Sequence, residues 1–139
     1  MRDRTVAAKS ESVPGVINGK LAPPPIGTRC VCSEFPDSRA YVEPLRFDGD
    51  AAAAWQQLGD LIASLPRIEI QERTDTYLRA ISRTRMLGFA DDLEFRLHAE
   101  RFVIHVRSAS QVGIWDLGAN RRRVEEIRDQ WNRLTRPER

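Results

Sequence analysis

The sequence has few of the features that mark membrane, secreted or metal-binding proteins. It contains no run of about 18 apolar residues, which a membrane span requires. Its first twenty residues include no apolar core, so we expect no secretory signal. Two cysteines, Cys30 and Cys32, are too few for a structural zinc site, which takes about four ligands. A disulfide across one intervening residue would be strained, so we expect free thiols and a cytoplasmic protein.

The chain also lacks a large excess of either charge, and it has almost no lysine. Its formal net charge of +2 over 139 residues gives no indication of nucleic-acid binding. Twenty arginines accompany only two lysines, Lys9 and Lys20. Arginine is the better bidentate partner for carboxylates and phosphates, so the excess is compatible with an anionic ligand or an acidic partner. Codon bias is the other explanation.

Proline is concentrated at the N-terminus. Five of the eight prolines precede residue 40, and apolar periodicity is weak there. We therefore expect residues 1–39 to form a largely irregular arm, with a polyproline II segment at Pro23–Pro25. A single domain then covers residues 40–135, a length typical of one domain. Residues 136–139 are expected to be a disordered tail.

Two helices are predicted in this domain. The first covers Ala51–Leu65, with Asp50 as its N-cap and Pro66 directly after it. The second covers Arg121–Leu134, with Asn120 as its cap. Apolar residues at helical spacing should form the buried face of each helix: Trp55, Leu58, Ile62 and Leu65 in the first, and Val124, Ile127, Trp131 and Leu134 in the second.

Period-two alternation predicts the strands. The first is Tyr41–Phe47, with Pro44 indicating an edge or a bulge. Four more follow the first helix, at 68–73, 77–86, 91–98 and 101–110, and their inward residues include Leu78, Leu93, Phe95, Phe102 and Ile104. The predicted fold is α+β, with an approximately five-stranded, mainly antiparallel sheet and two helices packed on one face. The order of elements is β-α-β-β-β-β-α, and the other sheet face should be exposed to water.

The charged residues of this second face suggest a register. If Met86 lies opposite Asp91 and His98 opposite Arg101, Asp92 falls between Arg85 and Arg107. Glu94 then falls between Arg83 and His105. Facing opposite charges contribute about 0.2–1 kcal/mol per pair, and a slip of one residue would turn charges toward the core. We therefore predict a meander with a ladder of charge pairs.

The last helix begins with three arginines, Arg121–Arg123, although a helix N-terminus favours anions. Either Asp116 or the pair Asp91–Asp92 is expected to offset this charge. An anionic ligand bound at the helix start is the alternative.

Several motifs along the chain together resemble the family called domain of unknown function 1499. They are LRF-x-G-D-x-x-x-A-W, LPR-I-E-I, YLRA, GF-A-DD-L-EF, I-H-V-RSAS and D-LG-A-NRRRVE-x-IR. The resemblance extends from about Asn18 to Trp131 and implies a single domain with no established activity. Pro24 stands where relatives carry a cysteine, so a family disulfide through that position is impossible here. Ile81 and Gln111 replace a glutamate and an arginine, which places any role of that pair in doubt.

Two functions remain open. The first is a noncatalytic binding or assembly module that uses the arginine-rich sheet face and the start of the last helix to hold an anionic ligand or an acidic protein partner. The second is a small hydrolase-like enzyme that uses Asp92, Glu94 and His105 for acid–base chemistry, although neighbouring arginines would keep the carboxylates ionised. No cofactor or metal is expected, and the sequence leaves the oligomeric state open. The candidate binding residues are Arg83, Arg85, Asp92, Glu94, His105, Arg107, Asp116, Asn120 and Arg121.

Overall fold

The structure is a computed structural model of the whole chain, and it describes residues 14–25, 29–83, 89–111 and 118–136. Its elements follow one another as β1 (Val16–Ile17), β2 (Lys20–Leu21), β3 (Cys30–Cys32), β4 (Leu45–Arg46), α2 (Ala51–Ser64), β5 (Ile68–Arg73), β6 (Tyr77–Arg83), β7 (Ala90–His98), a 3-10 turn η1 (Ala99–Arg101), β8 (Val103–Ser110) and α3 (Ala119–Thr135).

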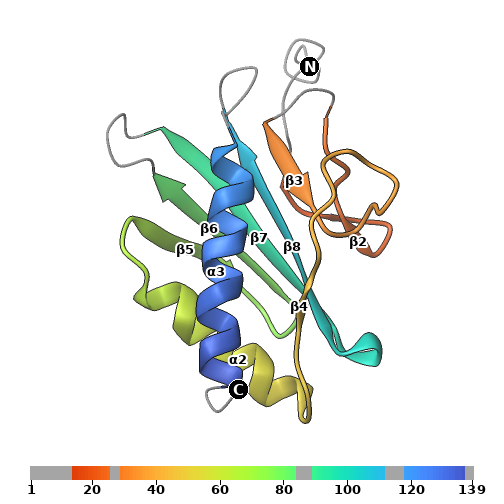
Figure 1. Cartoon of the computed structure of the whole chain (residues 1–139), viewed down its shortest axis with the longest axis vertical. Coiled ribbons are helices and arrows are strands. Elements are labelled where there is room, and N and C mark those ends of the chain that lie inside the picture. Colours follow the sequence, from red (N-terminus) through yellow and green to blue (C-terminus); the bar gives the residue numbers. More distant parts are fainter. Residues whose placement is uncertain (1–13, 26–28, 84–88, 112–117, 137–139) are drawn as a thin grey trace.

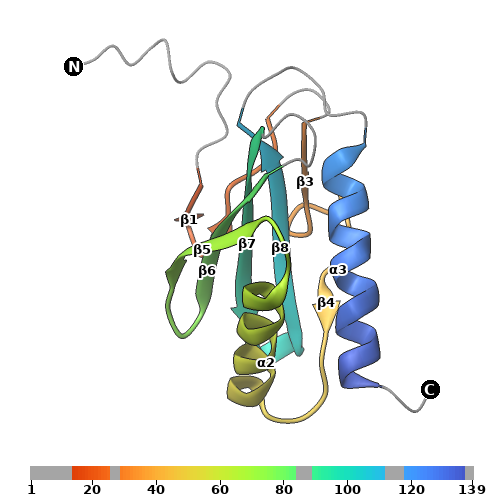
Figure 2. The ribbon, with the colours of Figure 1, turned by 90° about the vertical axis from the view of Figure 1, so that its left-hand side faces the viewer.

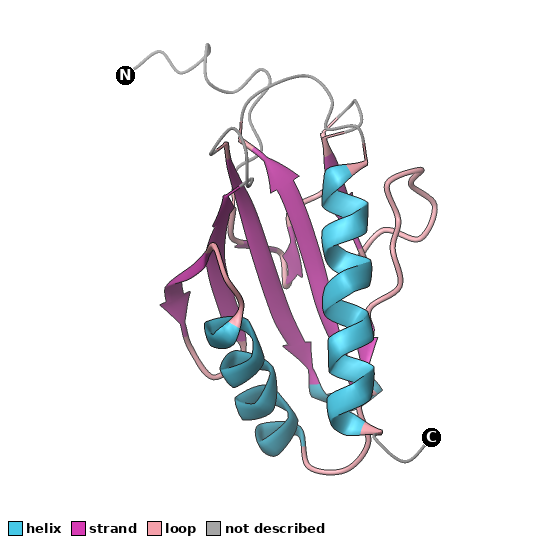
Figure 3. Cartoon of the chain, turned by 60° about the vertical axis from the view of Figure 1, so that its left-hand side comes forward, coloured by secondary structure: helices cyan, strands magenta, loops and turns pink. Residues whose placement is uncertain are grey.

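The main sheet is antiparallel and has six strands. Its order is β3-β8-β7-β6-β5, and β4 pairs with β8 beyond this path. Both helices lie on one face of the sheet (Figures 1 and 3). The predicted α+β class and the order of elements are therefore confirmed, with one strand more than the approximate number expected.

Local signals in the sequence explain the helices. The side chain of Asp50 accepts a hydrogen bond of 2.8 Å from the Ala53 N–H, so α2 has the predicted N-cap. Trp55, Leu58 and Ile62 are buried against the sheet, as are Val124, Ile127 and Trp131 of α3. Leu134 was expected to be buried, but it lies in the last turn of α3 and is 45% exposed. None of the described helices is long and apolar enough to cross a membrane.

The predicted first strand is shorter than expected. Of residues 41–47, only Leu45–Arg46 form a strand, while Tyr41 makes an isolated bridge to Cys32. Pro44 separates these two contacts, because a proline cannot donate a hydrogen bond to a neighbouring strand. Residues 14–39, assigned to the arm, contain β1, β2 and β3, and β3 is an edge strand of the main sheet.

The predicted hairpin registers are wrong, although the two faces of each strand are right. His98 lies opposite Val103, because η1 and Phe102 make the turn four residues long instead of two. Phe102 has a left-handed backbone (φ 57°) and is 52% exposed, not buried. In the preceding hairpin, Arg83 lies opposite Ala90 instead of Glu94. Both registers move by an even number of residues, which keeps the same side chains on each face.

The sheet face opposite the helices is covered over β7 and β8, so the expectation of a water-exposed face is wrong for these two strands. Strands β1 and β2 form a hairpin around Asn18-Gly19, whose φ angles of 54° and 81° suit a type I′ turn. Figure 2 shows β1 and α3 on opposite sides of the sheet. Strand β2 contacts β7 and β8, and Leu21 is completely buried. Glu94 and Arg107 on this face therefore lie between the sheet and the N-terminal arm, while Glu69 of β5 and Arg83 of β6 are exposed.

Candidate functional site

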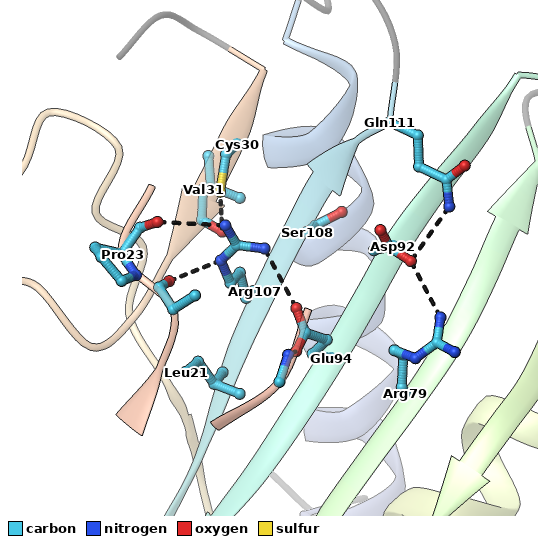
Figure 4. Close-up of polar contacts among 12 residues, drawn as sticks. Leu21, Pro23, Cys30, Val31, Arg79, Asp92, Glu94, Arg107, Ser108 and Gln111 are labelled. Carbon is cyan, nitrogen blue, oxygen red and sulfur yellow. Dashed lines mark hydrogen bonds and ion pairs between the residues drawn. The ribbon is translucent and has the colours of Figure 1, made fainter. Parts of the chain in front are cut away.

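The centre of the covered face is an ion pair between neighbouring strands. Glu94 of β7 lies opposite Arg107 of β8, and Arg107 Nη1 is 3.3 Å from Glu94 Oε2. Both side chains are buried, with exposed fractions of 0% and 1%. Arg107 also donates hydrogen bonds to the carbonyl oxygens of Ala22 and Pro23 in the arm, at 2.7 Å and 3.3 Å (Figure 4). Its guanidinium group therefore joins the sheet to the arm.

Glu94 accepts further hydrogen bonds from both sides. The Tyr77 hydroxyl donates to Oε1 at 2.7 Å, and the Gly15 N–H of the arm donates to the same atom at 2.8 Å. Burial raises the pKa of Glu94 above its ordinary value, and these donors and Arg107 oppose that rise. Burial and the nearby Glu94 also raise the pKa of Tyr77. These donors supply the hydrogen bonds that offset the cost of burying a carboxylate.

Asp92 lies beside this pair with different partners from those predicted. It stands opposite Ile81 of β6 and Ala109 of β8, and its Oδ1 receives hydrogen bonds from Arg79 and Gln111 at 3.4 Å and 3.3 Å (Figure 4). Because the register of β6 against β7 differs from the predicted one, Asp92 contacts Arg79 and not the expected Arg85. Ile81 and Gln111, the two departures from the family pattern, both lie beside Asp92: Ile81 faces it on β6, and Gln111 donates a hydrogen bond to it.

A second buried network surrounds Glu34, which follows β3. Arg96 of β7 binds both carboxylate oxygens, with distances of 2.6 Å and 3.0 Å, and the Leu21 N–H donates at 3.1 Å. Burial alone would raise the pKa of Glu34, but Arg96 and the Leu21 N–H hold that pKa below its ordinary value. The arm is thus fastened to the sheet at a second carboxylate.

His105 belongs to the same network and not to Glu94. Its Nδ1 is 2.8 Å from the Ser33 hydroxyl, and its Nε2 is 3.5 Å from Glu34 Oε1. Burial, helped by the charge of Arg96, lowers the pKa of His105 to about 4 although Glu34 acts in the opposite direction. His105 is consequently neutral at pH 7.

Ser33, His105 and Glu34 contain the groups of a nucleophilic triad, but their surroundings suit a structural role. Ser33 is 3% exposed, and its oxygen also accepts a 2.9 Å hydrogen bond from the Val106 N–H. Both oxygens of Glu34 are bound by Arg96. A nucleophile needs a free approach for the reacting carbon and donors for the developing oxyanion. The proposed hydrolase set of Asp92, Glu94 and His105 is distributed among three separate hydrogen-bond networks.

On the helix side of the sheet, Asn120 is the centre of a polar cluster. It lies inside α3, whose N-cap is Gly118, so its prediction as a helix cap is wrong. The amide of Asn120 donates to the Arg29 carbonyl and to Ser110, and its oxygen accepts from Ser108 at 2.6 Å. Burial of the helix start against β8 directs this side chain inward instead of toward the first turn.

The arginines at the start of α3 have three different environments. Arg123 forms a 2.8 Å ion pair with Asp91, so one acid of the predicted pair does offset the helix charge. Arg121 donates to the carbonyl oxygens of Tyr41 and Arg39, at 3.0 Å and 3.3 Å. Arg122 places its Nη1 beside Gly118 at the helix start, 3.2 Å from where a Cβ would lie if this glycine carried a side chain.

A groove lies where the end of α2, the first turns of α3 and the β5–β6 edge meet. It has a volume of about 280 Å³. Four arginines and one glutamate line it, together with apolar and polar residues: Arg67, Arg83, Arg122, Arg123, Glu126, Leu65, Pro66, Ile68, Ser82, Ala119, Ile127 and Gln130. Arg123 is paired with Asp91, so the other three arginines and Glu126 leave a net positive charge, to which the N-terminus of α3 adds.

The candidate residues from the sequence separate into groups. The covered face holds Asp92, Glu94, His105 and Arg107. Asn120 lies on the helix side of the sheet, and Arg83 lines the groove. Arg85 and Asp116 lie outside the described residues. Within the described ranges, no three or more histidine, cysteine, aspartate or glutamate side chains gather in a way that could hold a metal ion.

Sequence reasoning missed Glu34 and Arg67. Glu34 had no visible partner, because Arg96 is 62 residues away along the chain. The sequence did contain a signal for the β1–β2 hairpin, because Asn18-Gly19 is a strong indicator of a type I′ turn. Arg67 lies in the short connection between α2 and β5, directly after Pro66, where no periodic pattern indicates a direction for its side chain; its backbone is left-handed, with φ 61°.

Comparison with known proteins gives one match. A family model described as "Protein of unknown function (DUF1499)" matches residues 20–131, most of the chain. No curated protein and no solved structure matches the chain.

Proposed function

Because the chain belongs to the family described as protein of unknown function (DUF1499), whose description assigns no activity, we propose a function from the geometry: a noncatalytic module that binds a small anionic ligand. The observation that carries this proposal is the groove of about 280 Å³ lined by four arginines and a single acid. Guanidinium groups bind carboxylates and phosphates through paired hydrogen bonds, which makes an anion the best match.

The groove is a better candidate for binding than the charged sheet face. Glu94 and Arg107 are bound to each other and to the arm, and both are closed to solvent. In the groove, the side chain of Arg67 has no hydrogen bond or ion pair with any residue that the structure describes, and it is exposed. A ligand at the groove would need no displacement of the arm.

The dimensions of the groove favour a small ligand over the surface of an acidic protein. Ligand clefts have volumes of about 300–1,000 Å³, and this groove, at about 280 Å³, lies just below that range. Protein interfaces are usually broad and bury about 800 Å² on each partner. An acidic side chain of a partner remains chemically equivalent to a small carboxylate and serves as a comparison in the test.

The test is a thermal-shift titration of the full chain with inorganic phosphate, sulfate and citrate at constant ionic strength. A ligand that binds the folded state raises the melting temperature with dose. We expect such a rise in the wild type, a much smaller one in Arg122→Gln, and an unchanged one in Arg133→Gln. Arg133 is a suitable control because it lies on the same helix, is 74% exposed and does not line the groove.

An equal rise in Arg122→Gln and the wild type would place the anion elsewhere and overturn the proposal. Absence of any rise in the wild type with all three anions would do the same. A broad response to polyglutamate without a response to the small anions would favour an acidic protein partner instead.

A further inference from the structure

Resting on this proposed function, we propose further that the ligand is a phosphate monoester with a short apolar chain. The groove has an apolar and a charged part to its lining. The apolar residues, here called the apolar wall, are Leu65, Pro66 and Ile68 at the end of α2 and the start of β5, and Ile127 of α3. The charged residues, here called the charged wall, are arginines of β6, of α3 and of the α2–β5 connection, where Arg67 lies between Pro66 and Ile68. A ligand with a charged head group and a short apolar chain can contact both kinds of residue.

The apolar wall lies at the border of the hydrophobic core. Ile127 belongs to the core cluster, and Leu65 and Ile68 pack against it while remaining half-buried. Helix α2 ends at Ser64, so it does not extend over this part of the sheet. Contact with an alkyl chain would remove this apolar surface from water, which is favourable in proportion to the area covered.

The charged wall favours a doubly charged head group. Because Arg123 is paired with Asp91, the other three arginines and Glu126 give the lining a formal charge of +2. A phosphate monoester carries about −1.5 to −2 at pH 7 and offers three acceptor oxygens. A carboxylate carries one charge and two oxygens, so it would leave more of the guanidinium charge unbalanced. Ser82, which is buried, also lines the groove and carries a neutral hydroxyl.

The volume limits the length of the chain. A space of about 280 Å³ accommodates a head group and a few methylenes, but not a dinucleotide or a complete acyl chain. The affinity should therefore rise over the first methylenes and then remain constant. Since the groove is partly open to solvent, the same head-group chemistry could come from a soluble metabolite or from a lipid.

The experiment is isothermal titration calorimetry of the full chain with methyl, propyl, hexyl and decyl phosphate, below their micelle concentrations. We expect the affinity to rise about threefold to fourfold per methylene until the wall is covered, and then to stop rising. Hexyl sulfate and hexanoate should bind more weakly than hexyl phosphate, and hexylammonium should not bind.

Two variants of one strand test the apolar wall. Ile68→Thr should flatten the dependence on chain length while methyl phosphate binds as before. Ile70→Thr is the matched control, because Ile70 is on the same strand, packs against the same core and does not line the groove. Arg122→Gln should weaken every phosphate in the series by a similar factor.

The outcomes separate the two proposals. If phosphate and methyl phosphate bind through Arg122 but the affinity does not rise with chain length, this inference fails and the proposed anion-binding function stands. If no member of the series binds, both fail. Binding of vesicles that contain phosphatidic acid, with no binding of soluble hexyl phosphate, would overturn the soluble monoester and assign the chemistry to a membrane lipid. A rise with chain length that Ile68→Thr leaves unchanged would place the chain outside the groove.

Discussion

Glu94 and Arg107 face one another on neighbouring strands, and the N-terminal arm closes over both. The carboxylate accepts from the Gly15 N–H, and the guanidinium donates to the Ala22 and Pro23 carbonyls. The hydrogen bonds from Gly15, Ala22 and Pro23 to this pair are made by the backbone of the arm. Side chains of the arm contribute elsewhere, through the buried Leu21 and through the ion pair of Glu34 with Arg96.

Arg107→Leu should destabilise the protein by about 3–5 kcal/mol, because it leaves the carboxylate of Glu94 buried without its partner. The free energy of unfolding is measured by denaturant titration. The double variant Glu94→Gln with Arg107→Leu should recover a part of this loss. An Arg107→Leu variant as stable as the wild type would contradict a role for the pair in closing the arm over the sheet.

Acid should destabilise the fold through His105. Burial lowers the folded-state pKa of His105 to about 4 from the ordinary 6.5. Above pH 6.5 the ring is neutral in both states and stability is complete; below that pH the unfolded state takes up the proton first. Stability is thus lost as pH falls from 6.5 toward 4, by about 2 kcal/mol between pH 7 and pH 5. His105→Gln should remove most of this dependence, and a parallel decline in both proteins would refute the assignment.

Asn120→Ala should destabilise the protein by about 2–4 kcal/mol. Its amide satisfies the Arg29 carbonyl and Ser110, and its oxygen accepts from Ser108 and Arg123. Each buried polar group left without a partner costs about 1–3 kcal/mol. Asn132→Ala, on a less buried part of the same helix, provides the control. Equal thermal unfolding of the two variants would show that the cluster adds little.

Gly59→Ala should stabilise the protein by about 0.5–1 kcal/mol, because glycine inside a helix is unfavourable relative to alanine. A Cβ at Gly59 would meet the guanidinium end of Arg73, which must move aside. That side chain is exposed at the end of β5 and can do so at little cost. A lower melting temperature for Gly59→Ala would indicate that Arg73 is fixed in place.

The secondary structure and the faces of the strands could be predicted because they depend on neighbours in the sequence. The side chain of Asp50 caps the helix that follows it directly, and β5 occupies the predicted residues 68–73. Alternation placed Leu93 and Glu94 on opposite faces, and the structure has them there. A side-chain period of two is a local property of an extended chain.

The partners of the charged residues were decided by contacts between distant segments. The left-handed Phe102 lengthens one turn, and this moves Glu94 from His105 to Arg107. The arm brings Gly15 to Glu94, 79 residues away, and converts an expected wet surface into a buried network.

The sequence by itself determined the α+β class, the cap of α2 at Asp50 and the face on which most strand residues lie, since propensity and periodicity act over a few residues. Only the tertiary structure decided the register, the burial of the charges and the arginine-lined groove. Those features require chain segments to meet across long loops. Many pairings of the twenty arginines with the acids are chemically equivalent until the backbone fixes which of them are close.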